Sequence, residues 1–189
     1  MNAPNVVTMK LEGSVKSHAR TDILARDVES VIDEPTVRGG TNLGLTPTET
    51  LMASLIGCTN VISHRIAERI NVKINKMDIN VEATFNKDGV SLAKEVEIPF
   101  PEINLYIKID TNASKEQLET IKRELKMYCP ISKVISNSGS KINDIWELIT
   151  GHGNSGNNRA VAYDSESKRV IMVEDDINAF AYNPENNTW

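Results

Sequence analysis

The fold is decided by residues 46–71, which read TPTETLMASLIGCTNVISHRIAERIN. Thr46 is an expected N-cap, Pro47 suits the first helical turn, and Glu49 completes a capping box with Thr46. Apolar residues then recur at spacings of three and four and form a continuous stripe: Leu51, Leu55, Cys58, Ile62, Ile66 and Ile70. Three further apolar residues widen this stripe: Met52, Ile56 and Val61. This pattern predicts a long, largely buried helix that stops at Asn71.

Strands are expected on both sides of this helix. Before it, apolar residues form a short run over 6–11 and alternate loosely over 21–32, and a glycine-rich loop over 37–47 leads into the helix. After it, alternation over 72–85, 90–98 and 103–109 predicts three more strands, the first two joined by a hairpin turn at Asp88-Gly89.

A second helix is expected after these strands. Ser114 and Gln117 make another capping box, and this helix stops before Cys129-Pro130 because a residue that precedes proline disfavours helical dihedrals. Pro130 opens a short helix through Val134, and residues 142–149 are compatible with a strand or a helical turn. The order β-β-α-β-β-β-α-α indicates an α+β fold with a mostly antiparallel sheet.

The composition changes after residue 150. The segment GHGNSGNN, which begins at Gly151, has the residues of a flexible linker. Two strand-like pieces follow it over 159–163 and 169–173, with SESK as the turn between them. We therefore expect one domain over 1–150 and a C-terminal extension over 151–189 that forms a β-hairpin.

Composition and charge exclude several classes of protein. The 189 residues carry 21 Lys and Arg against 26 Asp and Glu, a net charge of −5, which argues against a generic nucleic-acid binder. No apolar run approaches the ~20 residues that span a bilayer, and no export signal is visible, so we expect a cytoplasmic protein. His18, His64 and His152 lack metal-ligand spacing, so no metal site is expected.

The two cysteines are the candidate reactive groups. Cys58 lies on the apolar stripe of the long helix, where a free cysteine often serves only packing. Cys129 is placed at the N-cap of the short helix, where backbone N–H groups and the helix dipole favour a thiolate. They lie 71 residues apart in the chain, so the residues alone leave open both inert packing and a redox pair.

Residues 33–59, DEPTVRGGTNLGLTPTETLMASLIGCT, resemble the signature of the OsmC/Ohr family, the osmotically inducible and organic-hydroperoxide-resistance proteins. A second segment, YCPISKVI at 128–135, resembles the second cysteine motif of that family. The resemblance extends over about residues 18–149 and leaves out the tail. The first motif is matched at these positions: Gly39, Gly40, Asn42, Gly44, Thr46, Pro47, Glu49 and Cys58.

The resemblance implies an OsmC-like fold and a thiol peroxidase activity. Such proteins are intertwined homodimers in which antiparallel sheets wrap two long central helices, and they reduce organic hydroperoxides without a metal or flavin. Cys58 then corresponds to the peroxidatic nucleophile and Cys129 to the resolving thiol, with an external dithiol, a lipoyl protein or a thioredoxin-like protein, as the reductant. The alternatives are a stress or binding protein with little peroxidase activity, and a thiol redox sensor.

The family pairs its reactive cysteine with an arginine and a glutamate. Glu49 matches the glutamate, and Arg20 is the first candidate for the cation, ahead of Arg38 and Arg26. Glu49 and Cys58 lie nine residues apart, about 13.5 Å along one straight helix, so contact between them needs a broken helix or a second copy of it across a two-fold axis. The apolar wall expected to receive an organic peroxide consists of Leu51, Met52, Leu55 and Ile62.

Overall fold

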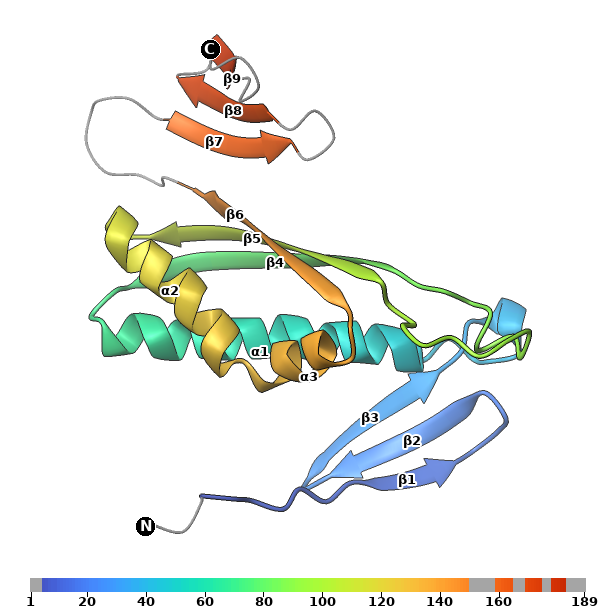
Figure 1. Cartoon of the computed structure of the whole chain (residues 1–189). Helices are drawn as coiled ribbons and strands as arrows, with labels where there is room; N and C mark the ends of the chain where they lie inside the picture. The colour runs from blue at the N-terminus through green and yellow to red at the C-terminus, as the bar shows by residue number, and fades with distance from the viewer. Residues whose placement is uncertain (1–4, 150–158, 165–168, 175–177, 183–189) are drawn as a thin grey trace. The chain divides into compact units, whose positions relative to one another are not determined.

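The computed structural model describes residues 5–149 and three later strands, at 159–164, 169–174 and 178–182 (Figure 1). The chain divides into two compact units, Met1–Ser54 and Leu55–Trp189, which we call the N-terminal and C-terminal units. None of the helices in these described parts combines the length and apolar character that a bilayer-spanning helix needs.

The N-terminal unit contains a three-stranded antiparallel sheet. Its strands are β1 (Glu12–Val15), β2 (Arg20–Ala25) and β3 (Val28–Asp33), in the order β1-β2-β3. The predicted run over 21–32 is therefore two strands, and the turn between them places Arg26 at a φ of 59°. The expected strand over 6–11 is wrong, because these residues are irregular and exposed and the first strand begins at Glu12.

The loop after β3 is held close to the sheet. It contains the short 3-10 helix η1 (Thr36–Arg38), and Asn42 adopts a left-handed φ of 57°. A Cβ atom on Gly40 would collide with the backbone carbonyl of Glu34, and one on Gly44 would collide with that of Val31. These close approaches explain why glycine stands at both positions.

Helix α1 (Pro47–Arg69) begins and ends as the sequence predicts. The amide of Glu49 donates to the Thr46 hydroxyl over 3.3 Å, and the Thr46 amide donates to the Glu49 carboxylate over 2.8 Å, so the capping box is formed. At the other end, Asn71 takes a left-handed φ of 55°, which stops the helix.

The C-terminal unit is built on a second sheet in the order β4-β5-β6. Strand β4 (Ile74–Thr84) pairs antiparallel with β5 (Glu102–Thr111), and β5 pairs parallel with β6 (Lys141–Leu148). Of the two alternatives for residues 142–149, the strand is therefore correct, and it ends at Leu148. The part of helix α1 from Leu55 onward, with α2 (Lys115–Tyr128) and α3 (Pro130–Asn137), also belongs to this unit. Figure 1 shows α1 and α2 on the same side of the sheet. The result is the expected α+β class with mostly antiparallel strands.

One face of β5 forms the centre of the core. Its alternate residues are almost fully buried, as the period of two in a strand requires: Ile103, Leu105, Ile107 and Ile109. Leu55 and Ile66 of α1, together with Ile121 and Leu125 of α2, are buried as well. Burying a side chain of this size contributes about 1.5–3 kcal/mol, so this layer dominates the stability of the unit.

The connection between β4 and β5 differs from the prediction. Residues 85–101 form turns and bends rather than a hairpin with a strand over 90–98. Val90 and Leu92 are 68% and 91% exposed, and Leu92 has a φ of 56°. The alternation over 90–98 failed as a signal because these apolar side chains have no sheet to pack against, whereas β5 takes the pairing with β4.

The described residues of the tail form three strands. Strands β7 (Arg159–Asp164), β8 (Arg169–Glu174) and β9 (Asn178–Tyr182) form an antiparallel sheet in the order β7-β8-β9. The two predicted strands are confirmed, and β9 was not anticipated. The expected SESK turn, residues 165–168, lies outside the described residues, and the domain division at residue 150 stays a prediction.

Candidate functional site: a pair of adjacent thiols

Cys129 occupies the junction between α2 and α3. Its backbone is extended, with φ −69° and ψ 109°, as the following Pro130 demands. The Cys129 amide still donates to the Leu125 carbonyl over 2.9 Å and closes α2. Its sulfur accepts a hydrogen bond of 3.4 Å from the Ser132 amide, so Cys129 is both the C-cap of α2 and the N-cap of α3.

The fold brings the two cysteines into contact. The Cys129 thiol donates to the sulfur of Cys58 over 3.0 Å, although the residues lie 71 positions apart in the chain. Both cysteines are free thiols here. Disulfide formation requires the two sulfurs to approach to about 2.05 Å, a movement of roughly 1 Å. The arrangement can therefore support reversible two-electron chemistry at sulfur.

The two thiols differ in their access to solvent. Cys58 is half-buried on α1, whereas Cys129 is fully buried. Burial, followed by the hydrogen bond to Cys58, raises the pKa of the Cys129 thiol to about 11, against the opposing effect of the Ser132 amide. The Ser132 amide lowers the Cys129 pKa in the direction that the N-cap position predicts, but desolvation outweighs this interaction.

An apolar cavity of about 240 Å³ begins one helical turn from Cys58. It is lined by Ile62, Ile66, Arg65, Arg69 and Tyr128. Arg69 is ion-paired with Glu124, and its guanidinium lies 6.0 Å from the centre of the Tyr128 ring. Tyr128 precedes Cys129 directly, so the cavity connects both cysteine-bearing segments.

This cavity coincides with the expected apolar wall only in part. Of the four residues predicted for that wall, all of which the structure describes, Ile62 alone lines the cavity. Leu55 is 1% exposed and belongs to the core. Tyr128 and the two arginines were missed. The position of Tyr128 beside Cys129 was the available signal for it.

Glu49 lies in the N-terminal unit, at the first turn of α1. Its carboxylate accepts the Thr46 amide, and this hydrogen bond is the main cause that lowers the Glu49 pKa. The nearby charge of Arg38 lowers the same pKa further. Arg38 also pairs with Glu34 over 2.6 Å. Of the three arginines considered for the cation, Arg38 is thus the one whose charge acts on Glu49.

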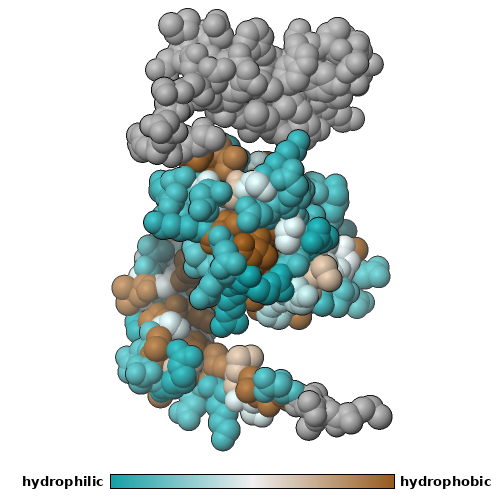
Figure 2. Space-filling model, turned by 90° about the vertical axis from the view of Figure 1, so that its left-hand side faces the viewer, coloured by the Kyte–Doolittle hydropathy of each residue, from teal (hydrophilic) through white to brown (hydrophobic). Residues whose placement is uncertain are grey.

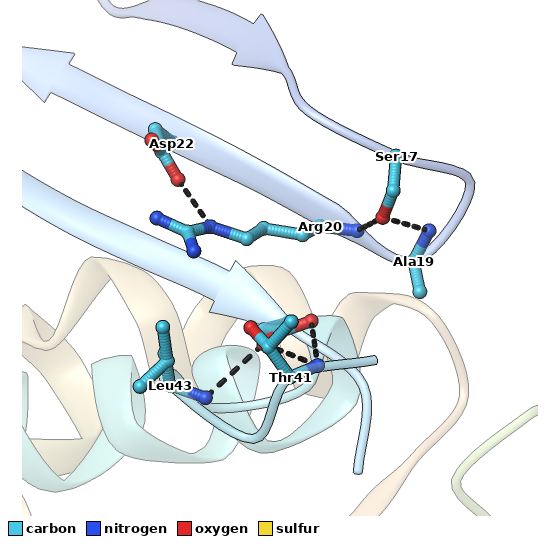
Figure 3. A network of polar contacts seen from close by, with 7 residues as sticks. Ser17, Ala19, Arg20, Asp22, Thr41 and Leu43 are labelled. Carbon is cyan, nitrogen blue, oxygen red and sulfur yellow. Dashed lines mark hydrogen bonds and ion pairs between the residues drawn. The ribbon is translucent and has the colours of Figure 1, made fainter. Parts of the chain in front are cut away.

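Arg20, the first candidate, is engaged elsewhere. Its Nε donates to the Asp22 carboxylate over 2.8 Å, and this bond raises the pKa of the guanidinium (Figure 3). Arg26 stands at the turn between β2 and β3 and is exposed.

Asp33 is a structural residue that the sequence reasoning overlooked. It is fully buried at the end of β3 and accepts hydrogen bonds from the Thr41 amide, the Thr41 hydroxyl (2.6 Å) and the Leu43 amide (3.1 Å). These donors fix the loop that carries Arg38 and leads into α1. Its place next to Pro35 and the glycine loop was the signal that it anchors a turn.

Comparison with known proteins identifies the family. The model of the family described as OsmC-like protein matches residues 40–143, more than half of the chain. The chain belongs to the OsmC-like family. This result confirms the resemblance read from residues 33–59 and 128–135. Among curated proteins, none matches the chain.

Solved structures show that the OsmC-like fold is shared. An OsmC-like protein from Mycoplasma pneumoniae superposes with a TM-score of 0.66 at 18% identity, covering 76% of this chain and 99% of its own. An organic hydroperoxide resistance protein OsmC from Legionella pneumophila gives 0.55 at 14% identity, covering 77% and 98%. One from Elizabethkingia anophelis gives 0.53 at 13% identity, covering 77% and 98%.

All the predicted site residues lie in the part of the chain that the structure describes. The structure brings Cys58 and Cys129 together, and it brings Arg38 near Glu49. Groups of three or more side chains suited to hold a metal ion are absent from the described residues.

Proposed function

We propose that this OsmC-like protein is a thiol-dependent peroxidase that reduces organic hydroperoxides to alcohols. The observation that carries the proposal is the 3.0 Å contact between the sulfurs of Cys58 and Cys129. Two free thiols in contact, one accessible and one buried, suit a nucleophile and a resolving partner. The names of the Legionella and Elizabethkingia proteins, which refer to organic hydroperoxide resistance, support the same activity.

Accessibility supports the proposed roles of the two sulfurs. A peroxide from solvent reaches half-buried Cys58, whereas Cys129 is fully enclosed. The Cys58 thiolate attacks one peroxide oxygen, the O–O bond breaks, and a sulfenic acid and an alcohol form. The sulfur of Cys129 then attacks the sulfenic sulfur, water leaves, and a disulfide forms that an external dithiol reduces.

The cavity that begins at Ile62, one helical turn from Cys58, supports an organic substrate. Ile62, Ile66 and Tyr128 offer apolar surface within about 240 Å³, which suits an alkyl or aryl group. Hydrogen peroxide has no group that gains from this surface. We therefore expect organic hydroperoxides to react faster than hydrogen peroxide.

A homodimer completes the proposed site. Gly57 and exposed Val61 leave one face of α1 open, and a Cβ on Gly57 would meet no atom within 4 Å. Apolar side chains reach the surface in several patches (Figure 2). An antiparallel α1 from a second copy would cover that face and supply Glu49 with Arg38, or with Arg20 as first expected, to the Cys58 of its partner. Two unlinked thiols fit a reducing compartment such as the cytoplasm.

The test is consumption of cumene hydroperoxide by the full chain with dihydrolipoamide or reduced thioredoxin as the dithiol. We expect turnover by the wild type, none by Cys58→Ser, and a single equivalent consumed by Cys129→Ser. Arg38→Ala and Arg20→Ala are compared in the same assay, and the variant that loses turnover identifies the cation. Arg26→Ala is the matched control for loss of an exposed arginine. Disulfide formation without turnover would contradict the peroxidase and favour the redox sensor.

A further inference from the structure

The proposed reaction has a proton requirement that the structure makes specific. When the Cys58 thiolate cleaves the O–O bond of an alkyl hydroperoxide, the leaving group is an alkoxide, which is a strong base and leaves readily only if it is protonated. In the second step, Cys129 must attack as a thiolate. Yet the Cys129 thiol holds its proton in the reduced protein, where it is buried and donates to Cys58.

We infer that Cys129 is the general acid of the first step, donating its thiol proton to the departing alkoxide before it acts as the resolving nucleophile. This inference rests on the proposed peroxidase function and adds a second catalytic role to Cys129. It explains how a thiol that is fully buried becomes a thiolate at the moment when the sulfenic acid appears.

The atoms and charges balance in both steps. First, Cys58-S⁻, R–O–OH and Cys129-SH give Cys58-SOH, R–OH and Cys129-S⁻: the Cys58 sulfur is oxidised, the O–O bond is reduced, and the proton moves to the alcohol. Second, Cys129-S⁻ attacks the sulfur of Cys58-SOH, the S–S bond forms, the S–O bond breaks, and hydroxide leaves to be protonated by solvent. No other oxidant is needed.

The surroundings of the two sulfurs support this role. Within residues 55–149, the thiol of Cys129 is the side-chain donor that touches the Cys58 sulfur, at 3.0 Å. When the proton leaves, the Ser132 amide already points at the Cys129 sulfur from the first turn of α3 and stabilises the new thiolate. Burial, which holds the proton on Cys129 in the resting state, makes that thiol a donor at neutral pH rather than an ionised bystander.

The inference is tested by comparing leaving groups in a single turnover. t-Butyl hydroperoxide releases an alkoxide that needs a proton, whereas peracetic acid releases a carboxylate that needs none. The reduced full-length protein is mixed with one equivalent of either oxidant, and loss of the Cys58 thiol is followed for the wild type, Cys129→Ala and Cys129→Ser.

We expect Cys129→Ala to slow the reaction with t-butyl hydroperoxide by roughly 100-fold, the usual contribution of a positioned general acid. The same variant reacts with peracetic acid at close to the wild-type rate, which also shows that its site is folded. Cys129→Ser keeps a donor of similar shape and falls between the other two with t-butyl hydroperoxide.

Equal slowing of both oxidants by Cys129→Ala would overturn the inference, because a packing defect acts on both. Unchanged rates with both would overturn it as well. Failure of the proposed function is a separate result: the wild type would then leave t-butyl hydroperoxide unreacted, whether or not peracetic acid oxidises Cys58.

Discussion

Oxidation of the Cys58–Cys129 pair will stabilise the folded chain. The disulfide closes a loop between residues that are 71 positions apart. Chain-entropy arithmetic for a loop of that length gives about 4 kcal/mol of stabilisation at 25 °C, since a loop of about 15 residues gives about 3 and one of about 100 gives about 4.7. Strain stays small, because sulfurs 3.0 Å apart need to move by only about 1 Å.

The assay is thermal unfolding of the reduced protein and of protein treated with one equivalent of t-butyl hydroperoxide, both without free reductant. At about 2–4 °C per kcal/mol for a chain of this size, we expect the midpoint to rise by about 8–16 °C. Cys58→Ser is the control, and its midpoint will not respond to the oxidant. Equal midpoints for reduced and oxidised wild type, or a covalent dimer on a non-reducing gel, would refute the reasoning.

Three further predictions concern the scaffold. Thr46→Ala removes the N-cap of α1, and we expect the free energy of unfolding to fall by about 1 kcal/mol in urea denaturation; an unchanged midpoint would contradict the capping box. Ile107→Ala leaves a cavity at a fully buried position of β5 and will cost about 2–5 kcal/mol in the same assay, whereas exposed Val90→Ala changes little. The Thr41 hydroxyl, followed by the backbone amides of Leu43 and Thr41, lowers the Asp33 pKa. The ionised Asp33 therefore stabilises the fold fully above its unfolded-state pKa, and this stabilisation is lost as pH falls through the lower folded-state pKa. We expect Asp33→Asn to flatten this acid limb when the free energy of unfolding is measured against pH, and an identical pH profile for the variant would refute the assignment.

The elements of the fold that local chemistry determines were predictable from the sequence. The predicted helix ends were correct because each depends on interactions within a few residues. These interactions are the capping boxes at Thr46 and Ser114, the left-handed stop at Asn71 and the break at Pro130. The strand over 90–98 was not, because alternation indicates a strand only where a neighbouring strand and a core are available, and β5 already occupies that position. Similarly, nothing local distinguishes one strand from two over 20–33.

The candidate site depended on the family resemblance more than on residue patterns. Cys58 and Cys129 are distant in sequence, and only the packing of α1 against the α2–α3 junction joins them. The sequence correctly placed Cys129 at an N-cap, where a lowered pKa was expected. It could not show that Cys129 is fully buried, and this burial raises its pKa instead. The ion pairs of Arg20 and Arg38 likewise depend on which neighbouring carboxylate each strand or loop presents.

The proposed chemistry requires the sulfurs of Cys58 and Cys129 to act as one redox pair within a chain. The direct measurement is to add one equivalent of t-butyl hydroperoxide to the reduced protein, block remaining thiols, and map linked peptides by mass spectrometry while the alcohol is quantified. The account predicts one equivalent of t-butanol, no free thiol, and a peptide linking Cys58 to Cys129. Both thiols remaining free with the peroxide intact would contradict it.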